Sequence, residues 1–322
     1  MDKHVKAYWK KNLMSTEEKR ITYESTVRFA NLSTRRHAKR LWIASHIGLS
    51  KSLRELSFLC HTYLRWIDDF IDFSEQPLNI KKHFLNNETI YVEQVENGII
   101  VTPNSLQEAC LFYFIKKARE LKMTGLIKSL RMMFSSFTFD LERMEPGNLM
   151  TQIQQEEYTK RIHKGMFDFI QQLILKTQPT NNHFVGPFYW HANSIRDLKE
   201  DLQFGIINLT KEESEKFKIN PSGLLTDPNF SCFIKYKGEL INNLLLKEAE
   251  ILHSMPMIIK IFWISGYSPI IIKMNRITLY DYQLSGTHGI SPLIEAKMLI
   301  NSFIKIFKLY YKVFFNIKTQ LD

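Results

Sequence analysis

The chain has 322 residues, of which 44% are hydrophobic and 24% are charged, and its formal net charge is +10. This composition excludes global disorder, because the chain has enough apolar side chains to bury a core. The basic balance indicates an anionic partner such as a phosphorylated metabolite or a membrane surface. We expect no nucleic-acid partner, because the net charge is the only feature of the sequence that suggests one. The small numbers of glycines (12) and prolines (10) favour long helices.

The three cysteines, Cys60, Cys110 and Cys232, lie far apart in the sequence. This spacing favours small core residues of a reduced intracellular protein over a disulfide framework or a zinc site. The amino-terminal segment is polar and lacks the apolar stretch of a signal peptide. No uninterrupted apolar run reaches the roughly 18 residues of a membrane-spanning helix. We therefore expect a cytoplasmic protein and leave peripheral membrane contact open.

The first hundred residues predict an arm, a basic patch and one long helix. Residues 1–30 form the expected amino-terminal arm and first helix, and residues 31–322 form a single helical domain. The basic patch, Ser33–Arg40, precedes a helix that begins after an N-cap at Ser50 and runs to about Ile71, because its apolar residues recur at three and four positions. Residues 74–104 contain Pro77, an Asn86-Asn87 pair and other turn signals, and are predicted to be irregular.

Helical periodicity resumes at Ser105 and predicts further helices over 126–143, 151–175, 229–253, 257–275 and 291–316. Residues 204–228 are predicted to form a long loop and a candidate flap, because they directly follow an acidic motif. The last helix carries Lys297, Lys305, Lys308 and Lys312 among apolar residues. That pattern fits a membrane surface, and it fits equally a helix packed on the bundle with a solvated lysine face.

The first acidic motif lies near the end of the helix that begins at Ser50. The run Arg65–Asp72 places Asp68 and Asp72 one helical turn apart, in an otherwise apolar and aromatic segment. Like charges at this spacing repel each other and destabilise a helix, so a cation is expected to compensate. Helical carboxylates suit Mg²⁺, which takes one or two of them and leaves positions for substrate phosphates.

The second acidic motif repeats the same spacing. Asn193, Asp197 and Asp201 follow one another at four-residue intervals, with Arg196 beside them, and would lie on one helix face. If the two motifs face each other across a cavity, four carboxylates converge, which is unfavourable in a low dielectric unless divalent cations neutralise them. Magnesium holding a diphosphate makes it a better leaving group. An allylic substrate would then leave a carbocation, which needs a dry pocket of apolar and aromatic side chains.

These residues resemble the squalene/phytoene synthase family. Arg65–Asp72 is similar to the first aspartate-rich motif of the family, and Asn193–Asp201 is similar to the second, which is the longer and more specific match. His37–Arg40 lies where the family has a basic patch that contacts diphosphate. Asp140–Arg143 resembles a turn ahead of the central helix, and Gly205–Leu209 resembles the segment that opens a flap. The resemblance spans about residues 30–215.

The resemblance implies an all-α, single-domain isoprenoid-synthase-type helical bundle around a central cavity. It also implies a Mg²⁺-dependent enzyme that joins two prenyl diphosphates, of C15 or C20 length, head to head. A reductive step with NADPH is left open. By position, the metal ligands and catalytic carboxylates are Asp68, Asp72, Asp197 and Asp201, with Asn193 as a further metal ligand. The diphosphate contacts by the same implication are His37, Lys39, Arg40, Arg65, Asn193 and Arg196.

The sequence departs from the family pattern in the central helix and in the flap. Where the family has a tyrosine followed by small residues, this chain has Arg161 and then His163-Lys164. Trp190 stands where a glutamine is often found, and Asn208 stands where a tyrosine is often found. These changes leave the acidic residues in place but alter the predicted pocket, so they put the usual product in doubt.

Two alternative functions stay open at this point. The altered pocket also suits a terpene cyclase that acts on one prenyl diphosphate. A non-catalytic, membrane-associated assembly factor could keep the same helical scaffold. The five residues Asp68, Asp72, Asn193, Asp197 and Asp201 argue against that last alternative, because a scaffold has no need of them.

Overall fold

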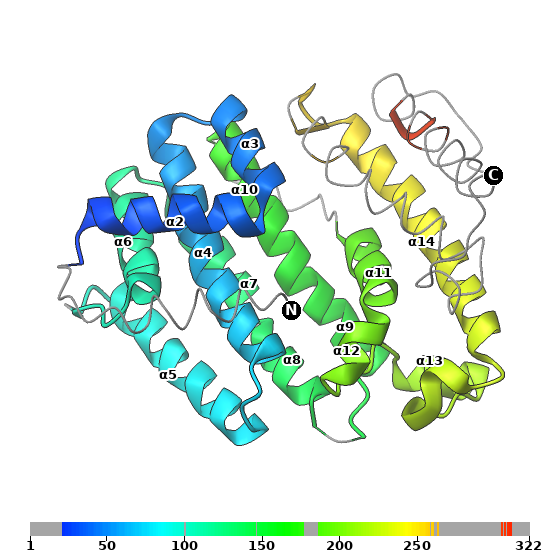
Figure 1. The fold of residues 1–322 in the computed structure, drawn as a ribbon. Coiled ribbons are helices and arrows are strands. Elements are labelled where there is room, and N and C mark those ends of the chain that lie inside the picture. Colours follow the sequence, from blue (N-terminus) through cyan, green and yellow to red (C-terminus); the bar gives the residue numbers. More distant parts are fainter. Residues whose placement is uncertain are drawn as a thin grey trace. The chain divides into compact units, whose positions relative to one another are not determined.

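The computed structural model describes residues 21–99, 101–145, 147–176, 186–257, 259–260, 263, 304, 306 and 308–310. Throughout these ranges the regular elements are helices and none is a strand, so the predicted all-α class is confirmed (Figure 1). The chain divides into two compact units, Met1–Lys122 and Met123–Asp322. Helix α2 (Tyr23–His37) crosses the expected boundary between the arm and the domain at residue 30. A single domain over residues 31–322 stays a prediction.

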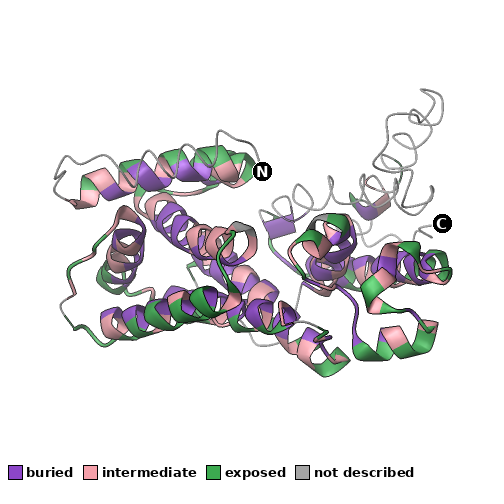
Figure 2. Ribbon diagram, turned by 60° about the horizontal axis from the view of Figure 1, so that its bottom comes forward, coloured by how far each residue is buried: buried purple, intermediate pink, exposed green. Residues whose placement is uncertain are grey.

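The first unit contains α2, α3 (Lys39–Gly48), α4 (Lys51–Phe73), α5 (Leu78–Glu96) and α6 (Leu106–Glu120). Helix α4 is its central element, because α2 and α6 both pack against it. The residues of α4 that are fully buried recur at three and four positions, which gives the helix a continuous apolar stripe. They are Leu56, Leu59, Tyr63, Ile67 and Ile71. Figure 2 shows the buried residues of the helices in purple. The predicted helix of this region is confirmed, and Ser50 occupies its N-cap position.

The prediction of irregular structure over residues 74–104 is wrong, because α5 occupies most of that segment. Asn86 and Asn87 lie within the helix and are exposed, where they cost little. Buried residues on the opposite side, including Leu85 and Val92, pack into the unit. Tyr91 also donates a hydrogen bond to the Glu108 carbonyl on α6 (3.1 Å). Tertiary packing therefore overrides the local turn preference.

Among the residues that the structure describes, the second unit contains eight α-helices, one π-helical turn and one 3-10 turn. In chain order these are α7 (Thr124–Phe134), α8 (Phe137–Arg143), α9 (Gln152–Thr159), the π-helical turn η1 (Lys160–Lys164), α10 (Gly165–Leu175), α11 (Pro187–Arg196), α12 (Leu198–Gln203), α13 (Lys211–Phe217), the 3-10 turn η2 (Pro221–Thr226) and α14 (Phe230–His253). Helix α7 packs against α10, and α11 packs against α14. The predicted helix over 229–253 is confirmed as α14.

Two predicted helices of this unit have a different internal structure. The one expected over 126–143 is divided into α7 and α8 at Ser135-Ser136. The one expected over 151–175 is continuous, but η1 interrupts its α-helical hydrogen bonding. Gly165, directly after η1, packs closely on α7, since a Cβ there would lie 2.8 Å from Met133 Cγ. A larger residue at this position would push the two helices apart.

The loop predicted over residues 204–228 is only partly a loop, because α13 and η2 lie within it. Thr210 and Glu213 form a capping box that starts α13, with each side chain accepting from the backbone N–H of the other residue (both 3.1 Å). The lysines predicted on the last helix lie outside the described residues except Lys308, which is half-buried. Cys60 and Cys110 are buried as predicted, whereas Cys232 on α14 is exposed and is not a core residue.

Candidate functional site

The first acidic motif lies on the last turns of α4 and is organised by Arg65. The Arg65 guanidinium pairs with Asp68 Oδ2 through Nη1 (2.9 Å) and with Asp69 Oδ1 through Nη2 (2.5 Å). Burial works to lower the pKa of Arg65, but the charges of Asp68 and Asp69 outweigh it and raise that pKa. Asp72 adds to the same effect. Arg65 is thus placed to orient the carboxylates of this motif.

Two histidines and a threonine from α2 and α4 surround this cluster. Burial lowers the pKa of His37, while the negative charge of Asp69 opposes that shift and the positive charge of Arg65 reinforces it. These influences place the predicted residue His37 close to the motif. Burial, Arg65 and His37 together lower the pKa of His61 to about 4, and His61 Nδ1 lies 3.2 Å from Thr34 Oγ1. Both imidazoles are therefore neutral at pH 7.

Lys39 and Arg40, the other two residues predicted to contact diphosphate in this patch, are exposed on α3. Lys81 on α5 is a residue that the sequence reading missed. Its Nζ donates to the carbonyl of Ile71 (2.5 Å), and its buried ammonium lies near enough to Asp72 for that charge to raise its pKa against the larger effect of burial. The segment that carries Lys81 was expected to be irregular, which hid its position.

The second acidic motif crosses the junction of α11 and α12. Asp197 is the C-cap of α11 (φ −99°, ψ 0°) and precedes the first residue of α12. Its backbone N–H donates to the Asn193 carbonyl (2.8 Å), and the Asp201 N–H donates to the Asp197 carbonyl (2.8 Å). The structure therefore keeps the predicted one-turn spacing of the three residues, although the helix is divided at the middle one.

Arg196 holds Asp197 in a two-point ion pair. Its Nε donates to Asp197 Oδ1 (2.7 Å), and its Nη2 donates to Asp197 Oδ2. The hydrogen bond to Asp197 is the main reason that the pKa of Arg196 is raised; burial opposes it, and the charges of Asp197 and Asp201 add to it. Guanidinium forks of this kind fix a carboxylate in direction as well as in charge. The predicted pairing of Arg196 with a nearby acid is present in the structure.

A buried hydrogen-bond chain connects Asp201 to the flap segment and to α8. Asn208 Nδ2 donates to Asp201 Oδ2 (2.5 Å) and to the Ser194 carbonyl (3.2 Å). Arg143 Nη1 in turn donates to Asn208 Oδ1 (2.7 Å), and its Nη2 pairs with Asp140. These hydrogen bonds connect the three segments of the second unit on which the sequence resemblance rests, namely Asp140–Arg143, Asn193–Asp201 and Gly205–Leu209. Sequence reasoning identified the segments but not the link, because no spacing reveals it.

Several side-chain oxygens are buried without a hydrogen-bond partner among the described residues, and two of them belong to the acidic motifs. These two atoms are Asp69 Oδ2 and Asn193 Oδ1. A buried acceptor left unpaired costs about 1–3 kcal/mol, so an oxygen-seeking cation would stabilise such an atom. Within the part of the chain that the structure describes, no group of three His, Cys, Asp or Glu residues is assembled for a metal. The fit to Mg²⁺ thus rests on the chemistry of these oxygens.

Three of the residues that depart from the family pattern lie in the central helix or in contact with it: Arg161, His163 and Trp190. Arg161 pairs with Glu157 (2.9 Å) and lies over the Phe139 ring. His163 is buried against Gly186, whose Cβ would lie 2.2 Å from His163 Cβ, and burial lowers the pKa of His163 to about 3. Tyr158 is buried with its ring 6.5 Å from that of Trp190. Larger side chains therefore fill this part of the second unit.

A second buried network anchors α13. The Lys237 ammonium is fully buried, where it pairs with Glu213 Oε1 (2.6 Å) and lies 3.2 Å from His191 Nδ1. Burial lowers the pKa of Lys237, and Glu213 opposes that shift. Because Glu213 also completes the capping box, this lysine connects α14 to the start of α13. No motif in the sequence indicates this pair.

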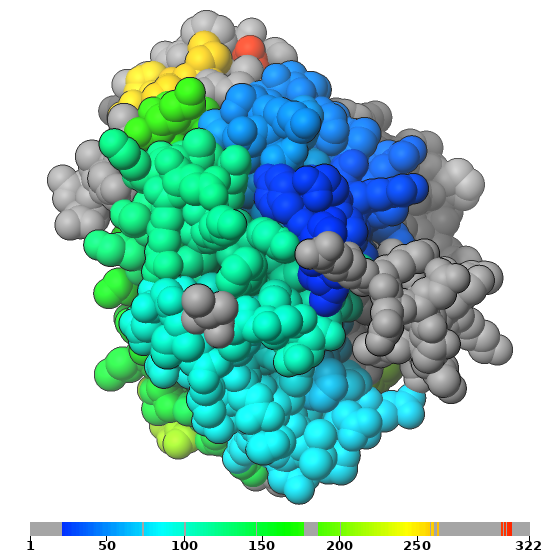
Figure 3. All heavy atoms as spheres, turned by 90° about the vertical axis from the view of Figure 1, so that its left-hand side faces the viewer, coloured from blue at the N-terminus to red at the C-terminus, as the bar shows by residue number. Residues whose placement is uncertain are grey.

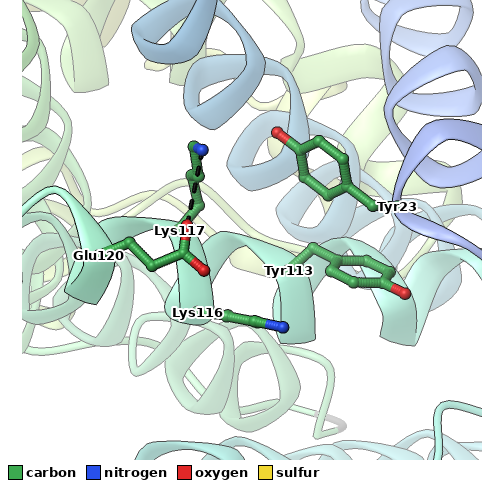
Figure 4. Close-up of a pocket in the computed structure, with 5 residues that line it drawn as sticks. All are labelled: Tyr23, Tyr113, Lys116, Lys117 and Glu120. Atoms are coloured by element: carbon green, nitrogen blue, oxygen red, sulfur yellow. Dashed lines mark ion pairs between the residues drawn. The ribbon is translucent and has the colours of Figure 1, made fainter.

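A pocket of about 160 Å³ in the first unit has none of the predicted site residues in its lining (Figure 4). It is lined by Tyr23, Tyr113, Lys116, Lys117 and Glu120. The rings of Tyr23 and Tyr113 meet edge to face, with centroids 5.4 Å apart. The Tyr23 hydroxyl is already committed to Glu55 Oε2 (2.6 Å). The pocket therefore offers few groups for chemistry.

The sequence matches no protein-family model and no curated protein. The structure is similar to that of a dehydrosqualene synthase in complex with ligand, at 15% identity and a TM-score of 0.59, covering 89% of this chain and 98% of the other. It is also similar to TcSQS, a squalene synthase, with the ligand BPH1237 (14% identity, TM-score 0.59, 92% and 94% covered). The same synthase with the ligand E5700 gives 13% identity, a TM-score of 0.63, and coverage of 92% and 93%.

These likenesses concern the fold, and they extend over most of each chain. The expected isoprenoid-synthase-type helical fold is therefore confirmed. Among the residues that the structure describes, no helix has both the length and the apolar character needed to cross a membrane. The two acidic motifs lie in different units of the chain, and their facing each other stays a prediction. The chain has a squalene/phytoene synthase-like fold.

Proposed function

We propose that the protein is a Mg²⁺-dependent prenyltransferase that ionises allylic prenyl diphosphates and condenses two of them head to head. The observation that carries this proposal is the organisation of the second acidic motif. Arg196 orients Asp197, Asn208 orients Asp201, and Asn193 Oδ1 is buried without a hydrogen-bond partner among the described residues. Carboxylates held in fixed directions beside an unsatisfied oxygen suit a metal-diphosphate site better than a scaffold.

In this proposal Asn193, Asp197 and Asp201 hold Mg²⁺ at one diphosphate, and Asp68 and Asp72 hold it at the other. Bound Mg²⁺ supplies charge neutralisation for the departing diphosphate. Arg65 and Arg196 keep the carboxylates in direction and remain charged, because their pKa values are raised. His37 offers a ring nitrogen for a hydrogen bond to diphosphate. We leave Lys39 and Arg40 out of this site, because both are exposed on α3.

The departures from the family pattern favour terpene cyclisation as the second candidate function. Two of the substituted residues are buried in contacts within the second unit: His163 lies against Gly186, and Trp190 packs on Tyr158. Bulky residues here leave less room for a second prenyl chain than small residues would. A site that accepts one substrate would then release a product with an unchanged carbon number.

Product analysis separates these functions. The purified protein is incubated with C10, C15 and C20 prenyl diphosphates and Mg²⁺, with and without NADPH. The hydrocarbon products are extracted, and their carbon numbers are determined by mass spectrometry. We expect a product with twice the carbon number of its substrate. A product with the same carbon number supports the cyclase, and no diphosphate release with any substrate contradicts both enzymes and favours a scaffold. EDTA is expected to abolish turnover and added Mg²⁺ to restore it.

A further inference from the structure

Helix α3 presents an apolar face to solvent, unlike the other long helices of the first unit. Its only buried residue is Ser45. Ile47 is 83% exposed and Ile43, one turn before it, is 43% exposed. Residues at this spacing lie side by side on one face of a helix. A two-isoleucine ridge therefore stands on the outside of α3, whose atoms belong to the blue surface in Figure 3.

Basic side chains flank the ridge. Lys39 lies one turn before Ile43 on the same face, and Arg40 lies beside it at the amino-terminal end of the helix; both are exposed. Arg35 and Arg36 at the end of α2 are exposed as well. We refer to Arg36, Lys39, Arg40, Ile43 and Ile47 as the α3 surface. No acidic residue occurs between Thr34 and Lys51, so these cations set the charge of the segment.

The opposite side of α3 fixes its direction. Trp42 Nε1 donates to Asn31 Oδ1 on α2 (2.7 Å), and Arg35 lies over the Trp42 ring (5.4 Å). The Trp42 ring also stacks on His46 (4.0 Å), which contacts Phe58 on α4 (5.7 Å). Because the inward side is held by α2 and α4, the isoleucine ridge cannot rotate into the unit without breaking these contacts.

Exposed isoleucines elsewhere in the unit have a different setting. Ile80 and Ile90 on α5 are 42% and 47% exposed, but they stand on a helix with six buried residues and are more than two turns apart. Isolated exposed apolar residues are common on protein surfaces. The α3 surface differs from them because its apolar residues are adjacent and have cations beside them. That combination is typical of a helix that lies in the plane of a membrane interface.

We propose that the α3 surface binds an anionic membrane. Ile43 and Ile47 enter the boundary between headgroups and acyl chains, and the three cations of the α3 surface contact lipid phosphates. The charge complementarity selects an anionic lipid surface, since each basic residue near such a surface strengthens binding by roughly five-fold. Lys39 and Arg40, expected from the sequence at a substrate diphosphate, are reassigned to lipid phosphates. This proposal does not depend on the proposed catalytic function.

The test is co-sedimentation of the full-length protein with vesicles of phosphatidylcholine alone and of phosphatidylcholine with 30% phosphatidylglycerol. We expect binding to the anionic vesicles that weakens as salt is raised. The double variant Ile43→Ser/Ile47→Ser should bind them at least ten-fold more weakly. The matched control is Ile90→Ser, which removes from α5 an isoleucine about as exposed as Ile43 (47% against 43%) and should leave binding unchanged.

Wild-type protein that does not bind anionic vesicles overturns the proposal, as does undiminished binding by the double variant. A wild-type dimer that the double variant converts to a monomer without lipid would instead make the ridge an interface between copies of the chain. If circular dichroism shows that the double variant is unfolded, Ile47→Ser alone takes its place, since that side chain is almost fully exposed and supports no core. A single variant that binds like wild type then contradicts the proposal.

Discussion

Asn208 holds Asp201 through a 2.5 Å hydrogen bond from its side-chain amide, and the other end of that amide is held by Arg143. Asn208 and Arg143 are buried, so neither bond competes directly with bulk water. A neutral amide orients the carboxylate without neutralising it, which leaves its charge available to a cation. Arg143 also forms an ion pair with Asp140, which neutralises its charge.

Asp197→Asn tests the proposed metal site directly. The substitution keeps the size of the side chain and removes the charge that pairs with Arg196. Because Asp197 is partly exposed at a helix junction, we expect little change in the melting temperature. Turnover should fall about 100-fold or more, as is typical when charge stabilisation at a reacting group is lost. Both quantities are measured on the same preparation, by diphosphate release and by thermal unfolding.

The control for Asp197→Asn is Glu215→Gln, which removes one exposed negative charge from α13 in the same unit. It should leave turnover unchanged. If Asp197→Asn retains wild-type turnover, the residue has no role in catalysis and the metal-site proposal is wrong.

Asn208→Leu tests whether Asn208 is a positioning residue for Asp201. The variant keeps the branched shape of the side chain but removes the donor to Asp201 and the acceptor for Arg143. We expect a loss of about 1–3 kcal/mol in unfolding free energy, because buried polar groups lose their partners. The Mg²⁺ concentration for half-maximal activity should rise several-fold, because Asp201 loses its orientation. A merely structural role would lower stability and leave that Mg²⁺ dependence unchanged.

Asn208→Asp is the companion variant. Its carboxylate can still accept from Arg143, but it repels Asp201, so its effect on the Mg²⁺ requirement should exceed its effect on stability. Equal Mg²⁺ requirements in wild type and both variants would contradict the positioning role.

Glu88 on α5 predicts a pH dependence of stability. Burial raises its pKa to about 7, while the hydrogen bond from the Tyr63 hydroxyl (3.0 Å) opposes that shift. In the unfolded chain the carboxyl ionises near its ordinary value of 4.5. Between these values the unfolded state binds fewer protons than the folded state, so stability falls as pH rises. The resulting loss of stability amounts to at most about 3 kcal/mol, and the full loss is reached above pH 7.

Glu88→Gln should remove this effect. Denaturant unfolding at pH 5 and pH 8 is expected to show a variant that is close to wild type at pH 5 and more stable than wild type at pH 8. Glu93→Gln, at an exposed position on the same helix, should change stability equally at both pH values. A pH dependence shared by wild type and Glu88→Gln would show that Glu88 is not its source.

The sequence predicted best where one strong pattern decided the structure. The apolar stripe of α4 and the acidic residues at its end are intrinsic to one segment, so periodicity alone locates Arg65 beside Asp68 and Asp69. Helix α5 was missed because Pro77 and the asparagine pair indicate turns locally. The contacts that stabilise α5 come from α4 and α6, which a reading of one segment does not include.

Links between distant segments were out of reach for a different reason. The bond from Arg143 to Asn208 joins residues 65 positions apart, and the Lys237–Glu213 pair is buried although both side chains are ionic. Neither has a characteristic spacing, and charged residues are normally expected at the surface. The exposure of Lys39 and Arg40, in contrast to the half-buried His37, likewise follows the break between α2 and α3 at Ala38.

The π-helical turn η1 between α9 and α10 determines which side chains of the central helix face each of its neighbours. A π turn contains more residues per turn than an α turn, so side chains after Lys164 are rotated relative to those before Lys160. Tyr158 therefore reaches Trp190, while Phe167 reaches Trp263 (5.4 Å). Loss of one residue within the turn would close it to an ordinary α turn and leave Gly165 facing α7. The same single-codon deletion within α10 would instead rotate every later side chain of the helix by about 100°, so the π turn is the place where this helix tolerates a change of length.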